Sequence, residues 1–263
     1  MADFCSFWFG GELTPYEVLA MKSFVDHGHS YTLFTYDSVS VPDRVAIGDA
    51  AEILPRDRLF LYRSGPGRGS VAGFTNLFRY HLLYTRGGWW VDADVVCLSS
   101  EVPQPEIFLG WEGEGLIGSA ILRFPAGHSF MATLRDAAES AGADISWGQT
   151  GPQLITRLAL SDPIVIHAAS ENTAYPNHWR DALFVLDPAK SEHIREKVGR
   201  TALLHLWNEM FRRAGIDKRL APPPESYLAE LFDRHGIVAP GPTASKLTVD
   251  GCAIPIEISP QQV

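Results

Sequence analysis

Cysteine, positive charge and long apolar runs are all scarce in this sequence, and each scarcity excludes a class of protein. Its 263 residues contain three cysteines, Cys5, Cys97 and Cys252, which are far apart and odd in number. They fit buried thiols better than a disulfide framework or a zinc site. The formal net charge of -9 argues against a protein that binds nucleic acid by neutralising phosphates.

The hydropathy pattern also argues against a membrane-spanning protein. No apolar run approaches the ~18 residues of a membrane span, and the amino terminus lacks the basic start and cleavage region of a signal peptide. We therefore expect a cytoplasmic protein, with peripheral contact at the inner membrane face left open. A composition of 46% hydrophobic and 20% charged residues is enough for one sizeable core. We expect a single domain over residues 1–240 and a tail, 241–263, that packs on it or trails from it.

A pair of carboxylates inside an apolar run dominates the rest of the sequence. After Gly87-Gly88, residues 89–91 predict a buried strand, Asp92 and Asp94 follow, and apolar residues resume at once. Side chains two positions apart on an extended chain point the same way, so the two carboxylates would face one point. Because aspartate is rarely buried unpaired, a hard divalent cation is the expected partner. A surface turn between two strands is the alternative.

The amino-terminal segment predicts a βαβ unit. Residues 4–9 and 31–36 have the composition of strands, and between them a capping box with Pro15 at the first helical position starts a helix that ends near Gly28. Such a unit implies a parallel sheet, whose ligands lie beyond the carboxyl ends of the strands. Trp8 is close to that edge, where it would stack on a planar ligand or pack in the core.

A second helix is predicted over residues 71–86, with Asn76, Arg79 and Tyr80 on its exposed or ligand side. The alternative for Arg79 is a solvated charge. Further along, we expect strands at 106–111, 117–124 and 164–167, and helices at 127–141, from Pro152 onward, and at 225–235.

The segment before the second helix also matches a dinucleotide-binding fingerprint. Gly67, Gly69 and Ala72 fit the G-x-G-x-x-G/A pattern, and Asp92 follows Ala72 by the spacing of a ribose-binding acid. An NAD-dependent oxidoreductase is therefore an alternative. It needs only one acid at the strand end, however, and its fingerprint strand is normally the first of the sheet.

Five blocks of the sequence resemble the DXD-containing sugar transferases, and they occur in the same order. The blocks are residues 8–11, 74–80, 87–95, 148–154 and 205–208. The α-1,4-galactosyltransferases and the fungal initiating α-1,6-mannosyltransferases are the most similar group, and the glucosylating clostridial toxins are more distant. The resemblance extends from about residue 4 to 235. It implies an α/β fold of the GT-A type, a Rossmann-like mixed sheet flanked by helices in a single domain.

The resemblance also implies a nucleotide-sugar donor, a divalent cation (manganese or magnesium) and retention of anomeric configuration. Asp92 and Asp94 correspond to the metal and diphosphate motif, Trp8 to the residue that stacks on the uracil, and Arg79 to the one that holds donor sugar and phosphate. Asn76 stands where many relatives have Asp and Ser119 where many have Asn, so the donor sugar stays open.

A carboxyl-terminal block completes the resemblance. His205, Trp207 and Asn208 match the motif that closes over the diphosphate, and His205 and Asn208 can complete the metal shell. The alternative for His205 is a satisfied core histidine. The animal galactosyltransferases have a membrane anchor, and we expect none in this chain.

We therefore predict a metal-dependent retaining glycosyltransferase that moves a hexose from UDP-galactose or UDP-glucose to a saccharide, glycolipid or protein. Besides the oxidoreductase, a non-catalytic carbohydrate- or nucleotide-binding module is an alternative. No carboxylate immediately flanks the turn at Gln149, and Asp144 and Glu112 are candidates that the fold would have to bring near it. A front-face route with Gln149 as a positioning residue, and Asp92 and Asp94 on the metal, is the favoured mechanism.

Overall fold

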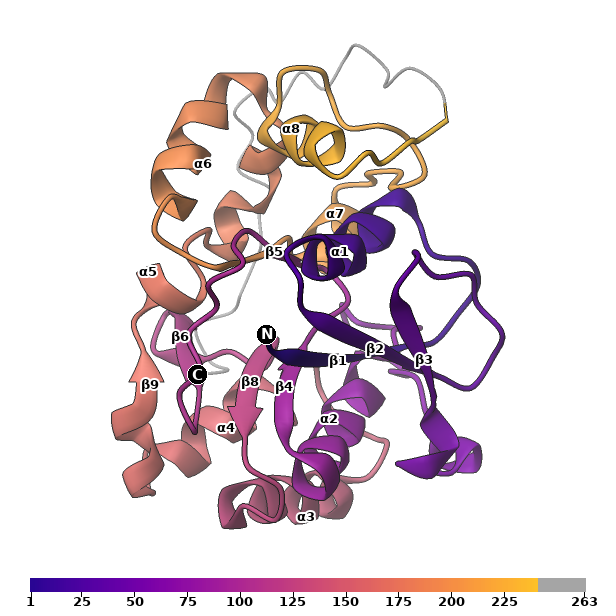
Figure 1. Cartoon of the computed structure of the whole chain (residues 1–263). Coiled ribbons are helices and arrows are strands. Elements are labelled where there is room, and N and C mark those ends of the chain that lie inside the picture. The colour runs from indigo at the N-terminus through magenta and orange to yellow at the C-terminus, as the bar shows by residue number, and fades with distance from the viewer. Residues whose placement is uncertain (241–263) are drawn as a thin grey trace.

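A computed structural model of the chain describes residues 1–240. The predicted tail, with Cys252, lies outside the described residues. Figure 1 shows the arrangement of the elements. The strands are β1 (Asp3–Trp8), β2 (Ser30–Thr35), β3 (Val45–Asp49), β4 (Gly88–Val91), β5 (Val95–Cys97), β6 (Leu109–Gly113), β7 (Leu116–Ile117), β8 (Ile121–Phe124), β9 (Ala168–Ala169) and β10 (Leu203–His205). The α-helices are α1 (Pro15–Asp26), α2 (Ala72–Arg86), α3 (Ser129–Ala141), α4 (Pro152–Ala159), α5 (Glu171–Ala174), α6 (Ser191–Val198), α7 (Asn208–Arg213) and α8 (Tyr227–Arg234). Short 3-10 helices are η1 (Ala50–Glu52), η2 (Arg56–Arg58), η3 (Pro163–His167), η4 (Trp179–Leu186) and η5 (Pro188–Lys190).

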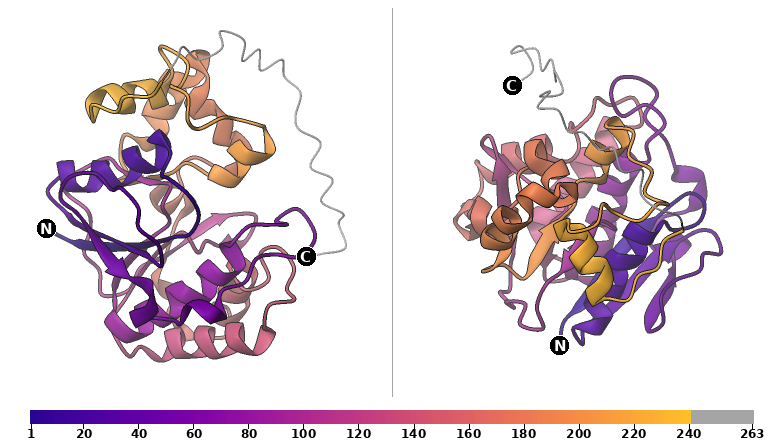
Figure 2. Two further views of the ribbon diagram at one scale, coloured as in Figure 1. Left: turned by 90° about the vertical axis from the view of Figure 1, so that its right-hand side faces the viewer. Right: turned by 90° about the horizontal axis from the view of Figure 1, so that it is seen from above.

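The main sheet has the strand order β3-β2-β1-β4-β8, in which β8 alone runs antiparallel to its neighbour. Helices α2 and α3 cover one side, and α1 with the carboxyl-terminal helices lies on the other, as both views of the ribbon show (Figures 1 and 2). The mixed α/β sheet flanked by helices confirms the predicted fold class. No helix within residues 1–240 combines the length and the hydropathy needed to cross a bilayer.

The predicted βαβ unit is confirmed at β1, α1 and β2. The Thr14 side chain accepts a hydrogen bond from the backbone of the first helical turn, and Glu17 accepts one from the Thr14 N–H, which together form the capping box. The helix ends at Asp26, and Gly28 follows with a φ of 81°. A left-handed glycine after the last turn reverses the chain into β2 at little steric cost.

Two small sheets connect distant parts of the chain to the main sheet. Strand β10 pairs antiparallel with β5, and its register places His205 opposite Val95. Strand β6 pairs with β7 and β9. The first pairing brings the carboxyl-terminal block directly beside the acidic pair. Cys97 is a buried free thiol on β5, and Cys5 is free and partly buried.

Three strand predictions need correction. Residues 164–167 form η3, because Pro163 and the Asp162 side chain, which accepts a hydrogen bond from the Ile164 N–H, start a helical turn instead. The strand predicted at 117–124 is divided into β7 and β8, and the one at 106–111 begins only at Leu109. In both places the apolar run continues through a break in pairing, and apolar periodicity alone cannot locate such a break.

Candidate active site

The acidic pair lies in a tight turn between strands of two different sheets. Strand β4 ends at Val91 in the main sheet, and β5 begins at Val95 in the small sheet with β10. The Val95 N–H donates to the Asp92 carbonyl at 3.0 Å and closes the turn. The structure therefore confirms that the acidic pair interrupts the predicted buried strand, and it places the two halves in different sheets. This turn is not a surface turn, because Asp94 is only 9% exposed.

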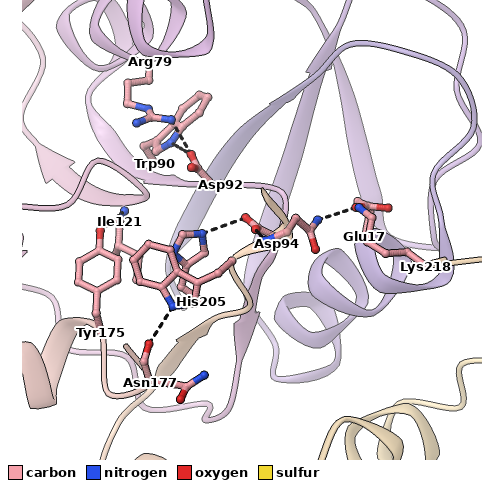
Figure 3. A network of polar contacts seen from close by, with 12 residues as sticks. Glu17, Arg79, Trp90, Asp92, Asp94, Ile121, Tyr175, Asn177, His205 and Lys218 are labelled. Carbon is pink, nitrogen blue, oxygen red and sulfur yellow. Dashed lines mark hydrogen bonds and ion pairs between the residues drawn. The ribbon is translucent and has the colours of Figure 1, made fainter. Parts of the chain in front are cut away.

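Asp92 is held by two side chains that approach it from α2 and β4. Arg79 Nη2 donates to Asp92 Oδ1 at 2.7 Å, and Trp90 Nε1 donates to the same oxygen at 2.8 Å. The guanidinium also lies over the Trp90 ring, 5.0 Å from its centroid. Arg79 is buried, yet its Nε and Nη1 have no hydrogen-bond partner among the described residues. Figure 3 shows this group beside the acidic turn.

Asp94 is held from the carboxyl-terminal side. His205 Nε2 lies 3.2 Å from Asp94 Oδ1, and the Asn208 backbone N–H donates to Oδ2 at 2.7 Å. Between them Trp207 adopts a left-handed conformation with a φ of 61°, which turns the chain so that the next amide faces the carboxylate. Such a conformation is costly for a bulky residue and persists only where the surroundings impose it.

These partners give the two carboxylates different electrostatic environments. Burial raises the pKa of Asp92, and the nearby Arg79 offsets this effect only in part. Burial also acts to raise the pKa of Asp94, but His205 and the Asn208 amide outweigh it and lower the pKa to about 2. Burial acts to lower the pKa of His205, while the facing Asp94 raises it more, so the net shift is upward. Asp94 is therefore the more acidic of the two carboxyl groups, and it lies opposite the His205 imidazole.

The arrangement fits a divalent cation. Asp92, Asp94 and His205 each offer one ligand atom, and these atoms all lie within 4.8 Å of one another. Two further atoms, His205 Nδ1 and Asn208 Oδ1, are buried without a hydrogen-bond partner in the described chain. Carboxylate and amide oxygens suit manganese and magnesium, and imidazole is tolerated by manganese. Buried polar atoms without partners are uncommon in folded proteins, so these two atoms are notable as groups that a ligand could satisfy.

The prediction that α2 offers three residues to solvent or ligand is wrong in part, because all three are buried. Tyr80 donates through its hydroxyl to the Thr150 carbonyl at 2.8 Å, and Asn76 Nδ2 approaches Thr150 Oγ1 at 3.4 Å. Arg79 is the one that reaches the acidic pair. The contacts with Thr150 tie α2 to the turn before α4.

Gln149 lies in that turn but is exposed, and its Oε1 accepts a hydrogen bond from the Ser146 N–H at 2.9 Å. The Gln149 side-chain amide therefore stabilises the turn in which it lies, and this hydrogen bond explains its orientation without a ligand. Ser119 is buried between β7 and β8. The structure joins neither of these side chains to the acidic pair by a hydrogen bond.

The two predicted tryptophans occupy different positions. Trp8 ends β1 and is partly exposed, and its Nε1 donates to the Gly11 carbonyl at 2.9 Å. Trp207 Nε1 donates to the Asn177 carbonyl at 2.8 Å, and its ring centroid is 4.1 Å from that of His205. Trp207 therefore covers the imidazole, while part of Trp8 stays available at the carboxyl edge of the sheet.

Glu112 contributes more than the sequence indicated. It lies on β6 at the point where the register with β7 shifts between Trp111 and Gly113, and such a bulge re-aims a side chain. Burial raises its pKa to about 7, and the charges that act on it include those of His205 and Asp92. Glu112 is thus a partly buried carboxyl group of raised pKa within electrostatic range of the acidic pair. Its sequence signal is weak, since Glu112 stands in a glycine- and glutamate-rich segment after an apolar run.

The dinucleotide fingerprint lacks the structure that it requires. Residues 59–63 form no strand, and the loop that follows closes on itself through hydrogen bonds between Tyr62 and residues 69 and 70. Gly67 packs against the Trp147 ring, and the Pro66 carbonyl accepts a hydrogen bond from Arg212. The glycine-rich segment is therefore a loop that bridges distant parts of the chain. The strand–loop–helix geometry of a nicotinamide site is absent from this part of the described chain.

Comparisons with known proteins agree with the resemblance seen in the motifs. No protein-family model matches the sequence. The chain is similar to the lactosylceramide 4-alpha-galactosyltransferase of Pongo pygmaeus, with 27% identity over 170 residues that cover 60% of this chain and 75% of that protein. The human protein of the same name also shows 27% identity over 170 residues, but the match covers 46% of it. The chain thus spans about half the length of the human relative.

Solved structures show a weaker likeness. The PaToxG glycosyltransferase superposes with a TM-score of 0.47 and 12% identity over 90% of this chain and 85% of that one. The glycosyltransferase GlyE of Streptococcus pneumoniae TIGR4 gives 0.39 and 11% over 91% of this chain and 65% of that one. Likeness at this level carries no argument about function. The sequence similarity to named glycosyltransferases and the mixed sheet flanked by helices both agree with the resemblance that the motifs show.

Proposed function

We propose that the protein is a metal-dependent retaining glycosyltransferase that moves a hexose from a UDP-sugar, UDP-galactose or UDP-glucose, to a saccharide, glycolipid or protein acceptor. The observation that carries the proposal is the buried group of Asp92, Asp94 and His205, whose ligand atoms lie within 4.8 Å of one another. The neighbouring Asn208 Oδ1 is buried without a partner in the described chain and adds a further oxygen.

Asp92 and Asp94 would hold manganese or magnesium, with His205 and Asn208 as further ligands. When bound, the cation would stabilise the charge that develops on the diphosphate as the bond to the sugar breaks. Asp94 is suited to this role because it is ionised over the whole physiological pH range. The His205 ring faces Asp94 and packs against the Trp207 ring, which holds it in place.

Arg79 provides a second positive group for the diphosphate. Its Nε and Nη1 are buried and have no partner in the described chain, while Nη2 is fixed by Asp92. Leaving charged donors unsatisfied is costly, and phosphate oxygens would satisfy both in a charge-assisted geometry. Trp8 offers a partly exposed ring at the carboxyl edge of the sheet on which a uracil would stack.

Retention fits a front-face route in which the leaving diphosphate helps to deprotonate the acceptor. Gln149 remains our proposed positioning residue, acting through the turn that it caps. Asn76 and Ser119 are the positions at which we propose that the donor sugar is selected. For a double displacement, Glu112 is the carboxyl group that we propose, because the charges of His205 and Asp92 act on it. An inverted product anomer would remove both routes.

Calorimetric titration of UDP in the presence of manganese and in the presence of a chelator tests the proposal. We expect UDP to bind tightly only with the cation, and UDP-galactose or UDP-glucose to be slowly hydrolysed without an acceptor. NAD serves as the control ligand. Selective binding of NAD would support the oxidoreductase, and metal-dependent UDP binding without any turnover would support a non-catalytic binding module.

A further inference from the structure

A fully buried carboxylate lies at the start of α1, on the opposite side of Asn208 from the acidic pair. Glu17 is 0% exposed and accepts hydrogen bonds from four donors. Oε2 takes the Thr14 N–H and hydroxyl, and Oε1 takes Asn208 Nδ2 at 2.7 Å and the Lys218 ammonium group. Figure 3 shows Glu17 and Lys218 beside Asp94.

Helix capping explains only half of this arrangement. A capping box needs one carboxylate oxygen on the Thr14 N–H, and such a glutamate can remain at the surface. Burying the whole carboxylate is costly unless every lone pair is used, and a buried cation must then accompany it. The second oxygen of Glu17 is directed at two groups near residue 210, far from α1 in the sequence. The start of the helix therefore does not explain why Glu17 contacts Asn208 and Lys218.

The Glu17 carboxylate fixes the orientation of the Asn208 amide. The two ends of a side-chain amide look alike, and only their hydrogen-bond partners distinguish them. An ionised carboxylate accepts but never donates, so the amide atom that faces Glu17 must be the NH2 nitrogen. Oδ1 then points away from Glu17, and it is buried without a partner in the described chain. The backbone N–H of the same residue is bound to Asp94 Oδ2.

We propose that Glu17 is a positioning residue of the metal site. It holds Asn208 by the amide nitrogen, so that Oδ1 is presented as a neutral oxygen ligand beside Asp94. Lys218 neutralises Glu17, which keeps this third carboxylate from repelling the acidic pair. The inference rests on the proposed function and adds to it a connection between the first helix and the cation.

Two variants remove the contact in different ways. Glu17→Asp keeps the negative charge opposite Lys218, but its carboxylate is one methylene too short to reach the Asn208 amide. The double variant Glu17→Met/Lys218→Met replaces the buried ion pair by apolar side chains of similar size, a change that folded proteins often tolerate. Thr14→Ala is the matched control, because it weakens the same helix start and leaves the contact between Glu17 and Asn208 in place.

The measurement is the ratio of UDP affinity with manganese to UDP affinity with chelator, together with direct manganese binding by electron paramagnetic resonance at saturating UDP. Residues that orient metal ligands typically change metal affinity 10–100-fold, so we expect about a tenfold loss or more in both Glu17 variants and none in Thr14→Ala. Because one variant keeps the charge and the other removes it, equal losses exclude a long-range electrostatic effect.

Each outcome separates the two proposals. If the wild type shows no effect of manganese on UDP binding, the proposed function fails. If the wild type shows the effect and a folded Glu17 variant retains it in full, the positioning role is wrong while the function stands. A loss of equal size in Thr14→Ala would also overturn the inference, since it would trace the effect to the helix start. Thermal unfolding identifies folded variants, and either Glu17 variant alone decides the question.

Discussion

Asp92 and Asp94 are identical side chains, but their pKa values shift in opposite directions in this site. Asp92 is balanced by one guanidinium and shares an oxygen between two donors, while Asp94 uses both of its oxygens. Asp94 also connects two elements, since its backbone carbonyl accepts the Leu206 N–H. A test of its chemistry must therefore preserve its hydrogen bonds.

Asp94→Asn preserves the shape of the side chain and removes its charge. We expect the metal-dependent part of UDP binding to disappear and kcat/KM to fall ~10²-fold or more, because one charged contact to the developing transition state is lost with the cation. The exposed Asp136→Asn serves as the control. Steady-state kinetics and calorimetry measure both quantities. Full activity in the folded Asp94 variant, or a wild type that ignores chelator, would refute the metal site.

Glu112 predicts a pH dependence of stability in protein treated with chelator. Burial raises its pKa from 4.5 to about 7, so between those values the native state binds more protons than the unfolded state. The free energy of unfolding should therefore fall as the pH rises from about 4.5 to 7. Glu112 should account for a loss of ~1–2 kcal/mol in the free energy of unfolding over this pH range, after allowance for its partial exposure. Glu112→Gln should remove this contribution. Urea unfolding at several pH values measures it, with the exposed Glu106→Gln as control. Parallel pH profiles of wild type and Glu112→Gln would exclude the raised pKa.

The junction of β10 and α7 places both His205 and Asn208 beside Asp94. Pairing of β10 with β5 places His205 beside Asp94, and the left-handed Trp207 turns the next residue back toward it. The motif resemblance in the sequence predicted His205 and Asn208 as metal ligands. It could not predict the partner strand, because residues 95–97 and 203–205 meet only through long-range packing. The conformation of Trp207 is likewise imposed by the tertiary structure, as no local propensity favours it.

Asn208→Ala separates the side chain of this junction from its backbone. The backbone N–H to Asp94 remains, so the turn should survive while the neutral ligand oxygen is lost. We expect UDP and metal binding to weaken together, by about tenfold. Calorimetry with and without manganese provides the comparison. An equal loss of UDP affinity under both conditions would assign Asn208 to packing or to a direct phosphate contact.

The turn at residues 146–151 is a second element whose effect on catalysis can be isolated. Gln149 caps it from within, and Tyr80 and Asn76 hold it against α2. If the turn positions the sugar, Gln149→Ala should lower kcat more than it weakens UDP-sugar binding, since such an interaction is realised mainly in the transition state. Donor hydrolysis provides the assay. Unchanged turnover would remove Gln149 from the mechanism.

For the whole molecule, local signals predicted more of the fold than of the site. The capping box, Gly28 and the apolar periodicity of α2 are local signals, since each depends only on residues of one short segment. The structure confirms the elements that they predict. The site combines residues 17, 79, 92–94, 112 and 205–218, and no periodicity connects such distant positions. Glu17 illustrates the difference. Its capping role could be predicted from three neighbouring residues, whereas its contact with Asn208 depends on how both ends of the chain pack together.

This distribution predicts how the molecule as a whole responds to ligand. Because the site joins the first helix, α2, the β4–β5 turn and the β10–α7 junction, a ligand that bridges them should stabilise all four together. We expect UDP with manganese to slow amide hydrogen exchange in residues 15–26, 74–80, 92–97 and 203–213 at once, and UDP with chelator to have little effect. The surface helix α3 serves as the internal reference, since it contributes no side chain to the site. Protection confined to the neighbourhood of Trp8 would mean that the nucleotide binds without engaging the acidic turn, and the carboxyl-terminal junction would then have only a structural role.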